Sequence, residues 1–219
     1  MAKLVFNDIG ERLFETGVKN GVLYVMNEDG TYGNGVVWNG LTAVTESPSG
    51  AETTPLYADD VKYVVIYAAE EFGATVEAYT YPEEFEQCDG SAAISDGITI
   101  GQQTRATFGM CYRTSVGNDV QGQDFGYKIH IIYGAKAAPS EKSYATINDS
   151  PEAVTFSWEL STVPVPVTGF KPTATMVIDS TRVPADKMAL IEAKLYGSEE
   201  GDATLPLPDE ILELIKDQN

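Results

Sequence analysis

The stretch EAVTFSWEL, residues 152–160, shows the clearest strand pattern in the chain. Its apolar side chains alternate with polar ones, and they are Val154, Phe156, Trp158 and Leu160. Successive side chains of a β-strand point to opposite faces, so the alternation predicts a strand with one dry face and one wet face. A fold built from such strands needs a sheet whose dry face is covered.

Two further stretches carry the same period. RATFGMCYRT (105–114) places Ala106, Phe108, Met110 and Tyr112 on one face, and YKIHIIY (127–133) does the same with Tyr127, Ile129, Ile131 and Tyr133. The intervening VGNDVQGQDFG (116–126) indicates a hairpin with a long tip. The pair Asn20-Gly21 favours a tight turn with positive φ, so a second hairpin is predicted there. These signals indicate antiparallel pairing.

Helix signals are few. PADKMALIEAKLYG (184–197) begins with Pro184 and ends at Gly197, which are typical helix boundaries. Met188, Ile191 and Leu195 form one stripe that can pack on a sheet. A short helical turn is expected in PEEFEQC (82–88), and a further helix in PDEILELIKDQN (208–219).

Residues 27–60 form a long excursion rich in Gly, Thr, Ser and Asn. It also carries residues of the buried type, namely Trp38, Leu41, Val44, Leu56 and Tyr57. Long segments of this kind in compact domains are usually functional, so we predict an interaction arm and take these five residues as its contact candidates.

The formal charge is −19, from 33 acidic and 14 basic residues. Lys62 is the only basic residue between Glu28 and Thr104. Such a surface repels phosphate backbones and anionic lipid, so stable binding to DNA or to a membrane is disfavoured. No apolar run approaches the roughly 20 residues of a membrane span, and MAKLVFNDIGERLF (1–14) lacks the apolar core of a signal peptide, so synthesis in the cytoplasm is expected.

The sequence carries no catalytic, cofactor or metal signature. On one strand Glu71 and Glu77 would stand about 20 Å apart, too far for the roughly 5–9.5 Å of a glycosidase pair. His130 is the only histidine, and NEDGTYGNG (27–35) and NDVQGQD (118–124) lack the acidic spacing of a calcium loop. Cys88 and Cys111 are expected to be reduced thiols.

Several long strings together resemble one protein family. They are GVLYVMNEDGTYGNGVVWNGLTAVTESPSGAETTPLYADDVKY (21–63), EEFGATVEAYTYPEEFEQCDG (70–90), TIGQQTR (99–105), FGMCYRT (108–114) and YGAKAAPSEKSYATINDSPEAVTFSWE (133–159). The sequence resembles the major tail proteins, or tail tube proteins, of long-tailed phages and prophages of Gram-positive bacteria. The resemblance covers residues 21–197.

The resemblance implies a mainly β fold: an antiparallel β-sandwich or half-barrel of the tail-tube type, with a flanking α-helix and a long inter-strand loop arm. Residues 1–197 would be the tube domain, and 198–219 an acidic C-terminal extension with a possible short helix. Such subunits form homohexameric rings that stack into a tube for DNA delivery. The implied partners are other copies of the chain, a tape measure protein and tail terminator or tip proteins, and the implied location is the virion.

Residues 27–60 correspond to the loop that reaches the neighbouring ring, and residues 184–196 to the flanking helix. Glu71 and Glu77 are candidates for an acidic lumen lining past which DNA moves without specific binding, although the outer surface is the alternative for their strand. Two other functions remain open. One is the tube of a contractile injection system or a phage-tail-like bacteriocin, and the other is an acidic β-sandwich binding module.

Overall fold

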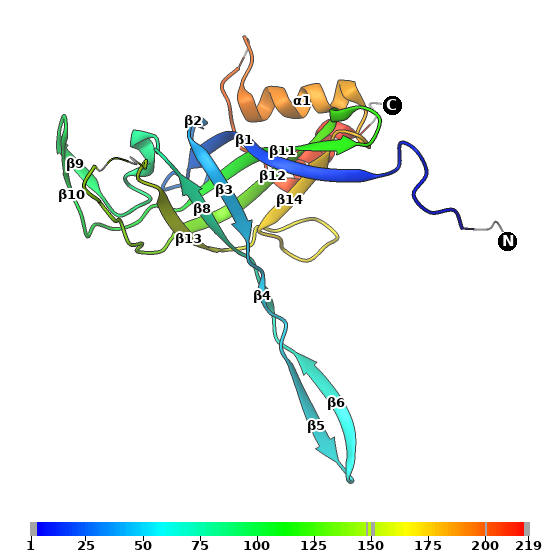
Figure 1. Cartoon of the computed structure of the whole chain (residues 1–219). Helices are drawn as coiled ribbons and strands as arrows, with labels where there is room; N and C mark the ends of the chain where they lie inside the picture. Colours follow the sequence, from blue (N-terminus) through cyan, green and yellow to red (C-terminus); the bar gives the residue numbers. More distant parts are fainter. Residues whose placement is uncertain (1–3, 148, 150–151, 200, 217–219) are drawn as a thin grey trace.

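The computed structural model describes residues 4–147, 149, 152–199 and 201–216. The described part is mainly β with antiparallel pairing and two α-helices, which confirms the predicted fold class (Figure 1). The strands are β1 (Leu13–Val25), β2 (Val36–Trp38), β3 (Leu41–Glu46), β4 (Ser49–Gly50), β5 (Thr53–Ala58), β6 (Val61–Tyr67), β7 (Glu70–Glu71), β8 (Gly73–Ala78), β9 (Ala92–Ser95), β10 (Ile98–Ile100), β11 (Phe108–Asn118), β12 (Gly122–Ala137), β13 (Phe156–Thr162) and β14 (Thr175–Asp179). The helices are η1 (Glu83–Phe85), α1 (Ala185–Tyr196) and α2 (Pro208–Ile215).

One eight-stranded sheet forms the body, in the order β2-β1-β11-β12-β13-β8-β3, with β14 also paired to β12. The strands at the two ends, β2 and β3, are joined through Asn39 and Gly40, so the sheet curls until its ends come together. The long strand β12 pairs with β14 at its middle, residues 128–132, and with β13 along its last residues, 135–137. The body is therefore a half-barrel rather than a flat sheet.

The predicted hairpin at Asn20-Gly21 is wrong. Both residues lie inside the single strand β1, which pairs with β11 on either side of them. Asn20 does have the expected positive φ, 53°, but it lies at a shift in the pairing register between Lys19 and Val22. Gly21 is needed for close approach, because a Cβ there would lie 2.3 Å from Cδ1 of Leu41. The same two residues that can make a turn here make a β-bulge.

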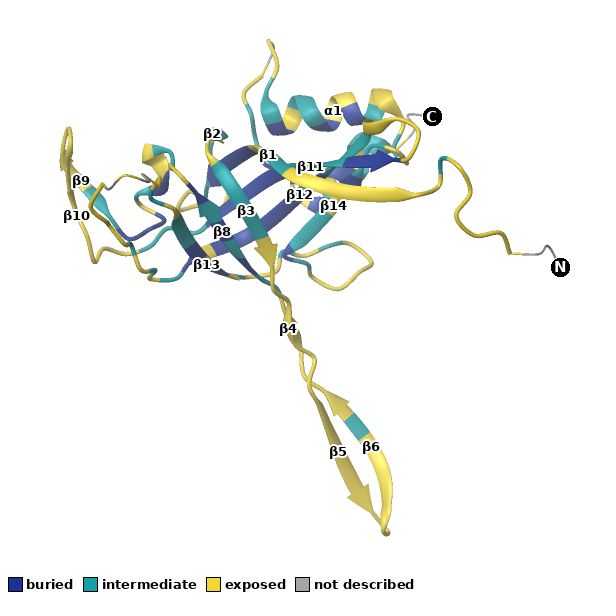
Figure 2. Ribbon diagram, viewed as in Figure 1, coloured by how far each residue is buried: buried dark blue, intermediate teal, exposed yellow. Residues whose placement is uncertain are grey.

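The concave face of the half-barrel holds an aromatic core. Trp158 of β13 is fully buried and contacts Trp38, Phe85 and Tyr81 edge to face, with ring centroids 5.0–5.7 Å apart. Trp158 and Leu160 are buried, as the alternation in residues 152–160 predicts. Each such side chain contributes about 1.5–3 kcal/mol by leaving water. Figure 2 shows this burial as the dark centre of the sheet.

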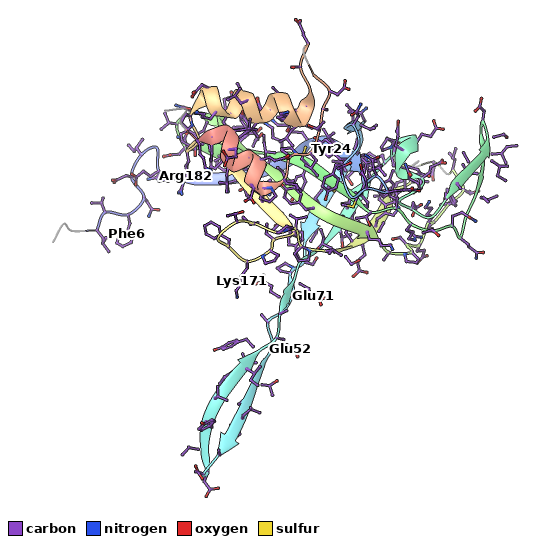
Figure 3. All side chains as sticks on the ribbon, turned by 180° about the vertical axis from the view of Figure 1, so that it is seen from behind. Phe6, Tyr24, Glu52, Glu71, Lys171 and Arg182 are labelled. Carbon is purple, nitrogen blue, oxygen red and sulfur yellow. The ribbon has the colours of Figure 1, made fainter. Side chains whose placement is uncertain are left out.

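The convex face is covered by both helices, which lie side by side in Figure 3, where the molecule is seen from behind. Met188, Ile191 and Leu195 of α1 are buried there, which confirms the predicted stripe. Ile211 of α2 lies in the same apolar cluster. The hydroxyl of Tyr24 donates to the carbonyl of Leu195 at 2.5 Å, so the sheet satisfies one of the otherwise unpaired carbonyls at the end of α1.

Candidate assembly surfaces

A two-stranded hairpin projects far from the body (Figure 1). It consists of β5 and β6, which pair with each other and with no other described strand. Asp59 and Asp60 form its two-residue turn, and their φ values of 50° and 60° fit the turn type that matches the twist of such a hairpin. A two-stranded hairpin alone is at best marginally stable in water, so this arm needs a further contact to be held rigid.

Apolar side chains cover both faces of the arm and almost all of them are exposed, as the yellow ribbon in Figure 2 shows. On β6 the odd positions Tyr63 and Tyr67 are 75% and 71% exposed, and the even positions Val64 and Ile66 are 43% and 53% exposed. Large exposed apolar patches of this kind mark interaction sites. The arm therefore offers two faces to a partner.

The predicted arm residues divide between the arm and the body. Leu56 and Tyr57 lie on β5 and are 44% and 67% exposed. Trp38, by contrast, is 2% exposed and donates from Nε1 to the carbonyl of Thr80 at 3.0 Å. Leu41 and Val44 are half-buried against the aromatic core.

The arm thus runs over residues 49–71 instead of 27–60, because residues 36–46 form strands that close the half-barrel. Sequence reasoning missed β6 as part of the arm. Its signal was present in VKYVVIY, an apolar run that follows TTPLYA across the two residues Asp59 and Asp60.

A narrow neck joins the arm to the body. In the neck Ser49 pairs with Glu71 and Gly50 with Glu70, while Ser47 donates its backbone N–H to the carbonyl of Gly73 at 2.8 Å. Gly50 has φ 81°, and a Cβ added there would lie 2.3 Å from the carbonyl oxygen of Ala69. The two neck strands therefore cross at a distance that only glycine permits.

The two acidic candidates lie in different surroundings. Glu71 is exposed in the neck, and Glu77 is half-buried in β8, where its register partners are Ser157 and Ala43. The alternation across β8 agrees with the sequence, since Ala74, Val76 and Ala78 are buried. The two carboxylates belong to separate elements, and the structure contains no site that they share within the described residues.

Besides the short end strands β2 and β3, which each pair on one side only, two strands have an unpaired edge in the described structure. The strand β1 is paired with β11 at both of its ends, with two register shifts between Thr16 and Val22, but β2 covers its other edge only at residues 21–23. The strand β14 is paired with β12 alone. Unpaired edges present rows of backbone donors and acceptors that can pair with another chain.

A polar cluster links four strands, β1, β3, β11 and β12. Glu15 of β1 accepts hydrogen bonds from Lys128 at 2.6 Å and from Thr114 at 2.5 Å, and it lies 3.1 Å from Nε2 of His130. Tyr112 donates to Glu46, the last residue of β3 before the neck, at 2.8 Å. Burial opposes ionisation of Glu15, but the bonds from Lys128, Thr114 and His130 outweigh it and lower its pKa to about 2.

The described residues offer little for catalysis. They contain no group of three or more His, Cys, Asp or Glu side chains that could hold a metal ion. Cys88 and Cys111 are free and buried, and burial raises the pKa of both thiols to about 12, so neither is an activated nucleophile. No helix among the described residues is long and apolar enough to cross a membrane.

Comparisons with known proteins give structural neighbours only. No family model and no curated protein matches the sequence. One similar chain comes from the six-fold symmetrised baseplate of the anti-feeding prophage, with TM-score 0.36 and 8% identity, covering 82% of this chain and 99% of that one. Another comes from the sheath-tube complex of an extracellular contractile injection system in the extended state, with TM-score 0.33 and 14% identity, covering 80% and 94%.

Proposed function

We propose that this chain is a structural subunit that polymerises through stacked homohexameric rings into a tail tube, the conduit for DNA delivery. The proposal combines the sequence resemblance with the surfaces described above. The observation that carries it is the arm, which exposes apolar side chains on both faces and contacts the body only through its neck.

The arm is costly for a chain that stays alone. Exposed apolar surface is unfavourable in water, and ordering each residue of a two-stranded hairpin costs about 1–2 kcal/mol. A second copy that covers both faces of the arm offsets these costs. The same copy-to-copy contact accounts for Leu56 and Tyr57, which face solvent in the single chain.

The open edges of the sheet suit ring formation. A contact between the β1 edge of one copy and a different edge of the next is head to tail, and head-to-tail contacts generate closed rings when the rotation closes. In such a ring, Glu71 and Glu77 are proposed to belong to a lining that repels DNA. A surface without lysine or arginine lacks the contacts that hold phosphate backbones.

Removal of the arm tests the proposal. The backbone N–H of Ala51 lies 3.2 Å from the carbonyl oxygen of Ala69, so residues 52–68 can be replaced by Asn-Gly with little change in the neck. We expect this variant to keep the β-rich circular dichroism spectrum and the melting temperature of the wild-type chain, and to form no tubes in negative-stain micrographs. The wild-type chain should form rings or long hollow tubes at the same concentration.

The matched control keeps the arm and changes only its tip. Asp59→Asn with Asp60→Gly preserves a turn that accepts positive φ at both positions and should assemble normally. Tubes from the arm-deleted chain would refute the role of the arm, and a wild-type chain that stays monomeric at high concentration would refute the tube function. Micrographs of particles carrying the chain also decide the alternative, because a contractile injection system or related bacteriocin surrounds its tube with a sheath.

A further inference from the structure

An apolar groove runs beside the open edge of β14. It has a volume of about 490 Å³ and lies between β14, the turn that follows it and α2. Its apolar lining includes Met176, Ile178, Val183, Ile211 and Ile215. Val177, on the same strand, is 49% exposed. An extended chain laid here could pair with the strand edge and place alternate side chains in the groove.

The N-terminal segment carries exposed apolar side chains and bends at Asn7, which has φ 59° and whose carbonyl accepts from the guanidinium of Arg12 at 2.9 Å. Leu4, Val5, Phe6 and Ile9 are 77%, 67%, 77% and 83% exposed. The segment is fastened to the body at Gly10, whose N–H donates to Asp119 and whose carbonyl accepts from Asn118. Beyond that point it leads away from the sheet (Figure 1).

The segment and the groove match in length and in charge. Residues 4–9 span about 20 Å when extended, close to the roughly 17 Å of a five-residue strand such as β14. The segment carries Asp8, and the charged lining of the groove is Arg182, Lys128 and Asp179. Lys128 is paired with Glu15 and Asp179 accepts from Thr181, whereas Arg182 has no ion-pair partner within the described part of the chain. In a chain of net charge −19, an available arginine beside an apolar groove favours an acidic apolar segment as its ligand.

We propose that residues 4–9 of one copy straighten at Asn7, release its carbonyl from Arg12 and add as a strand to the open edge of β14 of a second copy, with apolar side chains in the groove and Asp8 beside Arg182. The inference rests on the proposed self-assembly and names one of its joints. The second copy is favoured over the same chain because the contacts at Gly10 direct the segment outward, away from its own β14. Added backbone hydrogen bonds and buried side chains then hold neighbouring subunits together.

Cross-linking of full-length chains tests the pairing. Phe6→Cys and Val177→Cys are introduced in separate chains, which are mixed under assembly conditions and treated with a short bismaleimide. The native thiols are buried and should not react. We expect a covalent dimer from this mixture. The control pairs Val177→Cys with Ile94→Cys, whose side chain is 65% exposed on β9, and should give no dimer.

A chain carrying both Phe6→Cys and Val177→Cys separates the two possible routes. Pairing between copies gives a ladder of linked chains, whereas an internally linked monomer would overturn the proposal. Tubes that form without the dimer would also overturn it while leaving the tube function intact. A dimer in the absence of tubes would support the pairing and count against the tube. As a second measurement, Phe6→Asp should weaken association at least tenfold, and unchanged association would contradict the role of the segment.

Discussion

Replacement of Tyr63 by Ser isolates the contribution of the arm to assembly. Tyr63 lies on β6 and is 75% exposed in the single chain, so its loss removes little from the folding of the subunit. If a neighbouring copy covers it, the substitution removes buried apolar area from the polymer alone. The predicted effect is therefore confined to assembly.

The size of the effect follows from the exposed fraction. Full burial of a large apolar side chain is worth about 1.5–3 kcal/mol. Three quarters of Tyr63 remains to be buried, as its 75% exposure shows, so the loss should be about 1–2 kcal/mol per subunit. That loss raises the critical concentration for tube formation roughly 5- to 30-fold. Pelleting of polymer over a dilution series measures it, with calorimetric melting as the check on folding.

The chain offers a matched control in Tyr144. It is the same residue type and is 74% exposed, but it lies in the loop after β12, away from the arm. Tyr144→Ser should leave the critical concentration within about twofold of wild type. Equal shifts in the two variants would mean that any exposed tyrosine matters, and an unchanged critical concentration for Tyr63→Ser would mean that the arm is not covered. Either result would refute the reasoning.

Two further predictions concern the neck and the polar cluster. Gly50→Val should abolish tubes while the body keeps its melting temperature, because a Cβ at this position meets the carbonyl oxygen of Ala69 at 2.3 Å. Gly30→Ala should assemble, because Gly30 also has a positive φ, 83°, but no atom lies within 4 Å of the added Cβ. Electron microscopy of both variants checks this prediction. The folded-state pKa of Glu15 lies below its ordinary value of 4.5, so its contribution to stability is present above about pH 4.5 and is lost as the pH falls toward 2. Urea melts over that pH range measure the free energy of unfolding, and Glu15→Gln should make it fall less steeply as the pH is lowered. The change should be modest because the carboxylate is 34% exposed, and an unchanged pH dependence would show that Glu15 does not contribute to it.

The strands and the long helix could be predicted because their signals are local. The alternation in residues 152–160 and the stripe of Met188, Ile191 and Leu195 each require only that one face be buried. The structure buries all three helix residues and, of the alternating set, Trp158 and Leu160, while Phe156 is half-buried and Val154 lies before the strand. The Asn20-Gly21 turn failed for a nonlocal reason. Both halves of β1 pair with β11, so the residues that permit a turn were used for a bulge.

The arm shows the limit of reading burial from composition. Trp38 lies in a segment of loop-like composition yet sits in the aromatic core, because β2 and β3 close the half-barrel. VKYVVIY has the composition of a central strand yet lies exposed on the arm. Hydrophobicity indicates that a side chain will be covered, but it does not say whether its own chain or another copy provides the cover. Contact candidates chosen from sequence therefore mix core residues with interface residues.

Charge and apolar surface act at different ranges in the proposed polymer. Copies that each carry a net charge of −19 repel one another, but at physiological salt that repulsion is screened beyond about 8 Å. The arm, the open edges and the N-terminal segment act only on contact, through buried area and backbone hydrogen bonds. Two colliding subunits form few contacts and therefore stay apart. A growing ring or tube end would offer several contacts at once, enough to outweigh the repulsion. The same acidic composition that is proposed to keep DNA from adhering to a tube thus also opposes unordered association of the subunits.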